Sequence, residues 1–115
     1  MKVGIFRDKR KQFDEKKFFD GLMYWRCEDI AEPSNNHIYI DLEAESTLEA
    51  CRTVLETCEQ LDYIICPAVS YNYVIKMVKQ YCVDNKPDNL IMYMESKWNK
   101  YYIVRGWKIR DGELL

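Results

Sequence analysis

The chain has 115 residues, of which 48% are apolar and 31% are charged, and its formal net charge is −2 at pH 7. These totals exclude an intrinsically disordered chain and a membrane protein, and the length favours one domain, residues 1–115, with a single core. The chain enters an apolar stretch at once, without the pattern of a secretory signal peptide. We therefore expect a cytoplasmic protein that does not bind a membrane.

The first predicted elements are a strand over residues 2–6 and a helix over about 15–27. Asp14 stands where the helix N-cap is expected, and Phe13 and Phe18 on either side of it have the spacing of a hydrophobic staple. After a connecting loop, residues 37–42 alternate between polar and apolar side chains. This alternation predicts a strand with one poorer face, as expected at the edge of a sheet.

Two uninterrupted apolar runs, at residues 61–66 and 90–94, predict strands that are buried on both faces of a parallel sheet. A helical pattern precedes each of them. The helix before residues 61–66 starts at the capping box Ser46-Thr47-Leu48-Glu49 and is expected to end near Gln60. The helix before residues 90–94 has Ser70 at its N-cap and ends in a turn.

The last strand is predicted over residues 101–104, with an extension over 107–110. Only residues 95–100 separate it from the strand before it, which is too short for a parallel crossover, so the two strands should pair antiparallel. The element order is then β-α-β-α-β-α-β-β. It predicts an α/β fold, a three-layer sandwich with a mostly parallel sheet of flavodoxin-like order 2-1-3-4 and a C-terminal antiparallel hairpin strand.

In such sheets ligands favour the crevice beyond the carboxyl ends of the strands where the strand order reverses, here between the first and third strands. The free N–H groups at the start of the helix after Ser70, together with basic side chains, would suit an anion. No glycine follows either strand, so the backbone is not expected to wrap closely around a phosphate. The residues predicted at this ligand crevice are Arg7, Asp8, Lys9, Pro67, Ala68, Ser70, Tyr71 and Ser96.

The strand ends resemble, in degenerate form, the receiver domain of response regulators. Receivers carry acidic residues after the first strand, a phosphoryl-accepting aspartate after the third, a serine or threonine after the fourth and a lysine at the end of the fifth. Asp8 and Ser96 match by residue type, Arg105 replaces the lysine, and Pro67 stands where the acceptor aspartate should be. The resemblance implies a pseudo-receiver that cannot be phosphorylated in the usual way. The chain also lacks the helix that receivers have before their last strand.

Other residue types indicate no cofactor, no metal site and no catalytic set. The five cysteines are an odd number without a C-x-x-C pair, and their helical and strand positions favour free thiols in the core. His37 has no nucleophile motif beside it and is expected at the surface. Asp41, Glu43 and Glu45 could bind a divalent cation, but acidic residues also gather at helix starts without a ligand.

Charge and aromatic residues are unevenly distributed. Residues 28–62 carry one Lys or Arg against ten Asp and Glu, whereas residues 63–115 carry eight against five. Such asymmetry can mark a partner surface. Tyrosine, tryptophan and arginine, the residue types that dominate binding hot spots, gather near the C-terminus with several lysines. The residues predicted to contact a partner are Lys97, Trp98, Lys100, Tyr102, Arg105 and Trp107.

We therefore expect a small, non-enzymatic interaction protein that acts as a stoichiometric inhibitor or adaptor of another macromolecule, such as those that phages and mobile elements direct at host machinery. A protein is the expected partner. One alternative is a small-molecule or nucleotide-binding domain, with or without an enzymatic activity, that uses the crevice beyond the first and third strands. Another is a nucleic-acid-binding accessory protein that uses the basic and aromatic residues of 97–110.

Overall fold

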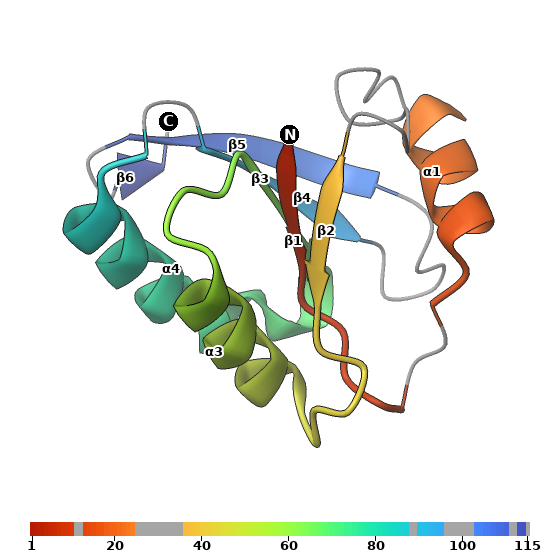
Figure 1. Cartoon of the computed structure of the whole chain (residues 1–115). Helices are drawn as coiled ribbons and strands as arrows, with labels where there is room; N and C mark the ends of the chain where they lie inside the picture. The colour runs from red at the N-terminus through yellow and green to blue at the C-terminus, as the bar shows by residue number, and fades with distance from the viewer. Residues whose placement is uncertain (11–12, 25–35, 88–89, 96–102, 111–112, 115) are drawn as a thin grey trace.

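The computed structural model describes residues 1–10, 13–24, 36–87, 90–95, 103–110 and 113–114. Helices cover both faces of a central sheet, with α3 and α4 on one face and α1 on the other (Figure 1). The elements follow in the order β1 (Lys2–Ile5), α1 (Glu15–Tyr24), β2 (His37–Ile40), α3 (Thr47–Thr57), β3 (Tyr63–Pro67), the 3₁₀ turn η2 (Ala68–Ser70), α4 (Tyr71–Asn85), β4 (Leu90–Glu95), β5 (Ile103–Arg110) and β6 (Glu113–Leu114).

Within the described residues, the strands form one sheet in the order β2-β1-β3-β4-β5-β6. The pairs from β2 to β4 are parallel, and β5 pairs antiparallel with β4. The predicted α/β fold and strand order are confirmed. The two apolar runs lie side by side at the centre as β3 and β4, with Ile64 packed toward α3 and α4 and Ile65 toward α1. Both side chains are fully buried.

The layer formed by α3 and α4 holds the larger apolar cluster, which includes Val54, Leu61 and Tyr81. Tyr81 fixes the connection between α3 and β3, because its hydroxyl donates to the Cys58 carbonyl oxygen at 2.7 Å and accepts from the Leu61 N–H at 2.9 Å. The sheet approaches this layer closely at Gly4. An added Cβ there would lie 2.8 Å from Val54 Cγ1 and 3.2 Å from Leu61 Cδ1, so β1 reaches α3 only because this residue has no side chain.

The first helix begins as the sequence predicts. The Lys17 N–H donates to Asp14 Oδ1 at 3.1 Å, which makes Asp14 the side-chain cap of α1. The rings of Phe13 and Phe18 lie 5.4 Å apart, as a hydrophobic staple requires. Phe18 and Phe19 then pack against β1 and β3 in a second apolar cluster.

Two helix boundaries differ in detail from the prediction. Helix α3 ends at Thr57 rather than near Gln60. Ser70 occupies the N-cap position of α4, but its side chain makes no capping hydrogen bond, because the turn η2 precedes the helix and leaves Ser70 in a helical backbone conformation. Lys86 ends α4 with a left-handed φ of 47°, and Pro87 follows it.

Cys51, Cys58, Cys66 and Cys82 are buried thiols outside any disulfide, as predicted; Cys27 lies outside the described residues. Burial raises the pKa of Cys51 to about 12 and that of Cys82 to about 11. Among the described helices, none combines the length and the apolar character that a membrane crossing requires.

Replacing Gly4 tests the close approach of β1 and α3. We expect Gly4→Ala to lower the free energy of unfolding by about 1–3 kcal/mol, because the added methyl group overlaps Val54 in a packed layer. Urea unfolding measures the change. In a Val54→Ala background, which removes the overlapping atoms, the same substitution should cost clearly less; an equal cost in both backgrounds would contradict this packing.

Candidate functional site

Connecting segments meet beyond the carboxyl ends of β1, β2 and β3. The Lys9 N–H donates to the Ala44 carbonyl oxygen at 2.9 Å, which joins the segment after β1 to the segment that leads into α3. These segments and the start of α4 surround a hollow of about 240 Å³. We call it the strand-end hollow; it is lined by Arg10, Ser46, Thr47, Leu48, Ser70 and Tyr73.

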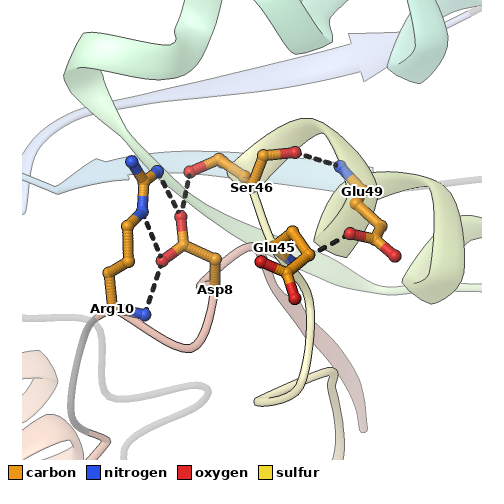
Figure 2. Close-up of polar contacts among 6 residues, drawn as sticks. Asp8, Arg10, Glu45, Ser46 and Glu49 are labelled. Carbon is orange, nitrogen blue, oxygen red and sulfur yellow. Dashed lines mark hydrogen bonds and ion pairs between the residues drawn. The ribbon is translucent and has the colours of Figure 1, made fainter.

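Asp8 lies beside this hollow with its side chain fully buried. Its Oδ1 accepts hydrogen bonds from the Arg10 N–H at 2.8 Å and from Arg10 Nε at 3.1 Å. Its Oδ2 accepts hydrogen bonds from Arg10 Nη2 at 2.7 Å and from Thr47 Oγ1 at 3.4 Å (Figure 2). Arg10 itself is 67% exposed, so the exposed guanidinium neutralises a carboxylate below the surface.

The hydrogen bonds from the Arg10 side chain lower the pKa of Asp8. Burial acts in the opposite direction, and the charge of Arg10 and the Thr47 hydroxyl add to the lowering. Asp8 is therefore a negatively charged group at neutral pH. The negative charge of Asp8 disfavours binding of an anion in the hollow. Asp8 and Arg10 together place one negative and one positive group at fixed positions there.

The capping box holds the start of α3 at the hollow. The Glu49 N–H donates to Ser46 Oγ at 3.2 Å, and Glu49 Oε2 accepts from the Glu45 N–H at 2.8 Å (Figure 2). The predicted reciprocal cap is present, although the Glu49 carboxylate accepts from the N–H of Glu45, the residue before the N-cap Ser46. Thr47 and Leu48, which line the hollow, are positioned by this cap.

Arg7 lies on the opposite face of the sheet from the strand-end hollow. Its guanidinium is fully buried, forms an ion pair with the buried carboxylate of Glu95 and also donates from Nε to Glu95 Oε1 at 3.4 Å. The guanidinium carbon lies 5.4 Å and 5.6 Å from the ring centres of Phe13 and Phe18. The expectation that Arg7 adds positive charge to an anion crevice is wrong, because this charge is committed to Glu95.

The other residues predicted at the ligand crevice are only partly brought together. Lys9 is about half exposed and pairs with Glu45 at 2.7 Å, a solvated contact that contributes little. Ser70 lines the hollow, while Tyr71 is half-buried against the core on the α3 side. Pro67 is buried as the last residue of β3, and Ala68 begins η2. Ser96 lies outside the described residues.

Most residues predicted to contact a partner also lie outside the described part of the chain, namely Lys97, Trp98, Lys100 and Tyr102. Arg105 and Trp107 belong to β5, where their backbones pair in register with Met94 and Met92. The partner surface over residues 97–107 therefore stays a prediction.

Several residues of the site were missed by sequence reasoning. Arg10 follows Asp8 by two residues, a spacing at which an aspartate commonly bonds the backbone, and this signal could have paired them. Glu95 ends an apolar strand, where a carboxylate requires a cation partner. The exposed apolar side chains of Leu48, Val69 and Tyr73 gave no signal, because the exposure of each residue depends on neighbouring elements.

Large apolar side chains are exposed at and beside the hollow: Leu48 and Tyr73 line it, and Val69 adjoins the lining residue Ser70 in η2, and we call these three residues its rim. Tyr73 is 73% exposed, Val69 is 54% exposed and Leu48 is 39% exposed. In the described residues, no group of three or more His, Cys, Asp or Glu side chains could hold a metal ion. A larger groove of about 330 Å³ runs between α3 and α4, and its lining residues, which include Arg52, Tyr81 and Asp84, differ from those of the strand-end hollow.

Comparison of the chain with protein-family models, with curated proteins and with solved structures gives no match.

The Asp8–Arg10 pair predicts a pH dependence of stability. Because the pKa of Asp8 is lower in the folded chain, its ionised form stabilises the protein above the pKa of the unfolded state, and this stabilisation is lost as the pH falls. We expect Asp8→Asn to lower the free energy of unfolding by about 1–3 kcal/mol at neutral pH, with the difference from wild type shrinking between about pH 5 and about pH 2.

Chemical unfolding across this pH range measures the difference. The control is Glu56→Gln, which removes an exposed carboxylate of α3 and should change stability little throughout. A gap between Asp8→Asn and wild type that widens on acidification would contradict the assigned pairing.

The Arg7–Glu95 pair predicts a strong coupling between the two residues. Either Arg7→Met or Glu95→Met alone should destabilise the protein by about 3–5 kcal/mol, because each leaves a buried charged group without its charge partner. The double variant Arg7→Met with Glu95→Met should recover much of this loss. A double-mutant cycle measured by urea unfolding gives the coupling; additive losses would contradict a buried ion pair.

Proposed function

We propose that this protein is a small interaction protein that binds another protein through the rim of the strand-end hollow. The observation that carries the proposal is the exposure of Leu48, Val69 and Tyr73 at a hollow where the side chains of Arg10, Ser46 and Thr47 already make hydrogen bonds. Exposed apolar and aromatic side chains beside an arginine are typical of a protein contact, in which tyrosine and arginine are enriched at hot spots.

The polar groups favour a protein partner over a small anionic ligand. Ser46 Oγ is used by the cap of α3, and Arg10 is held by Asp8. Arg10 Nε and Nη2 are bonded to the buried Asp8 carboxylate, which offsets the positive charge of the guanidinium, so a phosphate in the hollow would gain little net attraction from it. An apolar contact to Tyr73 and Val69 disturbs none of these bonds.

The receiver-like resemblance is compatible with the same proposal. Pro67 ends β3 and has no side-chain oxygen that could accept a phosphoryl group. A role as a stoichiometric inhibitor or adaptor requires a contact surface and no reaction. The residues 97–107 would extend this contact surface or form a second one.

The test compares two variants of helix α4 and its preceding turn. Affinity capture from a cell lysate and mass spectrometry would first identify the partner, and calorimetry would then measure its affinity. We expect Val69→Ser with Tyr73→Ala to weaken binding by about 2 kcal/mol or more, the scale of a hot spot, without a large change in melting temperature.

Val83→Ser is the matched control, because Val83 is 53% exposed but lies near the far end of α4. Its affinity should equal that of the wild type. If Trp98→Ala with Arg105→Ala weakens binding while the α4 variant does not, the contact surface lies at residues 97–107 instead. A purified chain that carries a nucleotide or nucleic acid, with no protein partner, would contradict the proposal.

A further inference from the structure

The outer side of β2 is an open sheet edge. Within the described residues, β2 ends the strand order and pairs only with β1 (Figure 1). The His37 N–H donates to the Met1 carbonyl oxygen at 2.7 Å, so the backbone of His37 faces β1. Because successive residues of a strand turn their backbone groups to opposite sides, the N–H and C=O groups of Ile38 and Ile40 face outward.

Natural sheet edges are commonly protected by lysine, proline or a bulge, and β2 contains neither lysine nor proline. Its register with β1 runs without a bulge from His37 to Ile40. The edge is therefore regular and presents hydrogen-bonding groups at the spacing of a strand. A further strand could continue the ladder there.

A hollow of about 160 Å³ lies along this edge between β2 and α3. It is lined by Ile38, Tyr39, Ile40, Thr53, Val54 and Thr57. A strand added outside β2 would direct every second side chain toward the α3 side, where this mostly apolar hollow would receive it. The backbone and the hollow thus favour the same kind of occupant, an extended segment with alternating apolar side chains.

The surrounding charge is negative. Asp41 follows β2 directly, Glu43 lies in the same segment, and Glu49 lies one turn before Thr53 on the same row of α3. The one basic residue between 36 and 62, Arg52, lines the groove between α3 and α4 instead, away from β2. A second copy of the chain would bring two such acidic regions together, whereas a basic segment would complement them.

We propose that the β2 edge binds an extended, lysine- or arginine-bearing segment of a partner protein by adding a strand to the sheet. This site is separate from the rim of the strand-end hollow, so the experiment below can confirm or contradict it independently of that contact.

The probe is a blocked heptapeptide with alternating valine and threonine at its centre and a lysine at each end, titrated into the full chain while the amide resonances are followed by NMR. We expect the Ile38 and Ile40 amides to shift and to exchange more slowly with solvent. A peptide with N-methylated central amides should bind at least about tenfold more weakly, because it cannot continue the ladder. The same peptide with glutamate in place of both lysines should also bind at least about tenfold more weakly at low salt.

Matched variants test the protein side. Ile38→Pro removes the outward N–H and should abolish binding, while Ile38→Ala keeps that N–H and should retain most of it. The Val69→Ser with Tyr73→Ala variant should bind the peptide normally. Equal binding of the N-methylated peptide, unshifted β2 amides, or equal binding of the glutamate peptide would overturn the proposal. A dimer that forms without peptide and is lost in Ile38→Pro would assign the edge to a second copy and overturn it too.

Discussion

The burial of Arg7 constrains the end of the sheet where the candidate site lies. A guanidinium without solvent contact is tolerated only where a counter-charge and other favourable contacts replace water, and here Glu95 and the rings of Phe13 and Phe18 supply them. Because Glu95 ends β4, the pair joins the ends of β1 and β4 across β3. Side chains of an extended segment alternate between faces, so Arg7 on the α1 face leaves Asp8 on the α3 face.

The position of Asp8 on the α3 face leads to the strand-end hollow. Asp8, placed under the start of α3, holds Arg10 at the surface and bonds Thr47, while the cap of α3 positions Leu48. The polar groups are thus largely satisfied among themselves, and the exposed surface that remains is apolar and aromatic. This combination supports the proposed contact with a protein over capture of a small charged ligand.

Patterns along the chain determined the architecture. The two apolar runs identified β3 and β4, because a strand buried on both faces needs apolar residues without alternation. The staple at Phe13 and Phe18 and the cap at Ser46 identified helix starts, since both depend on residues within one turn. The short connection after β4 identified an antiparallel neighbour. Each of these is a local signal, and sequence alone therefore determined the fold class and strand order.

The site depended on contacts between residues far apart in the chain. The sequence shows Arg7 and Lys9 as equally basic, yet Arg7 is buried with a partner 88 residues away and Lys9 is half exposed. The exposure of Tyr73 and the open edge at Ile38 and Ile40 are likewise set by which elements become neighbours. Only the tertiary structure decided these points, because burial and charge pairing are properties of the packed layers and leave no periodic signal in the chain.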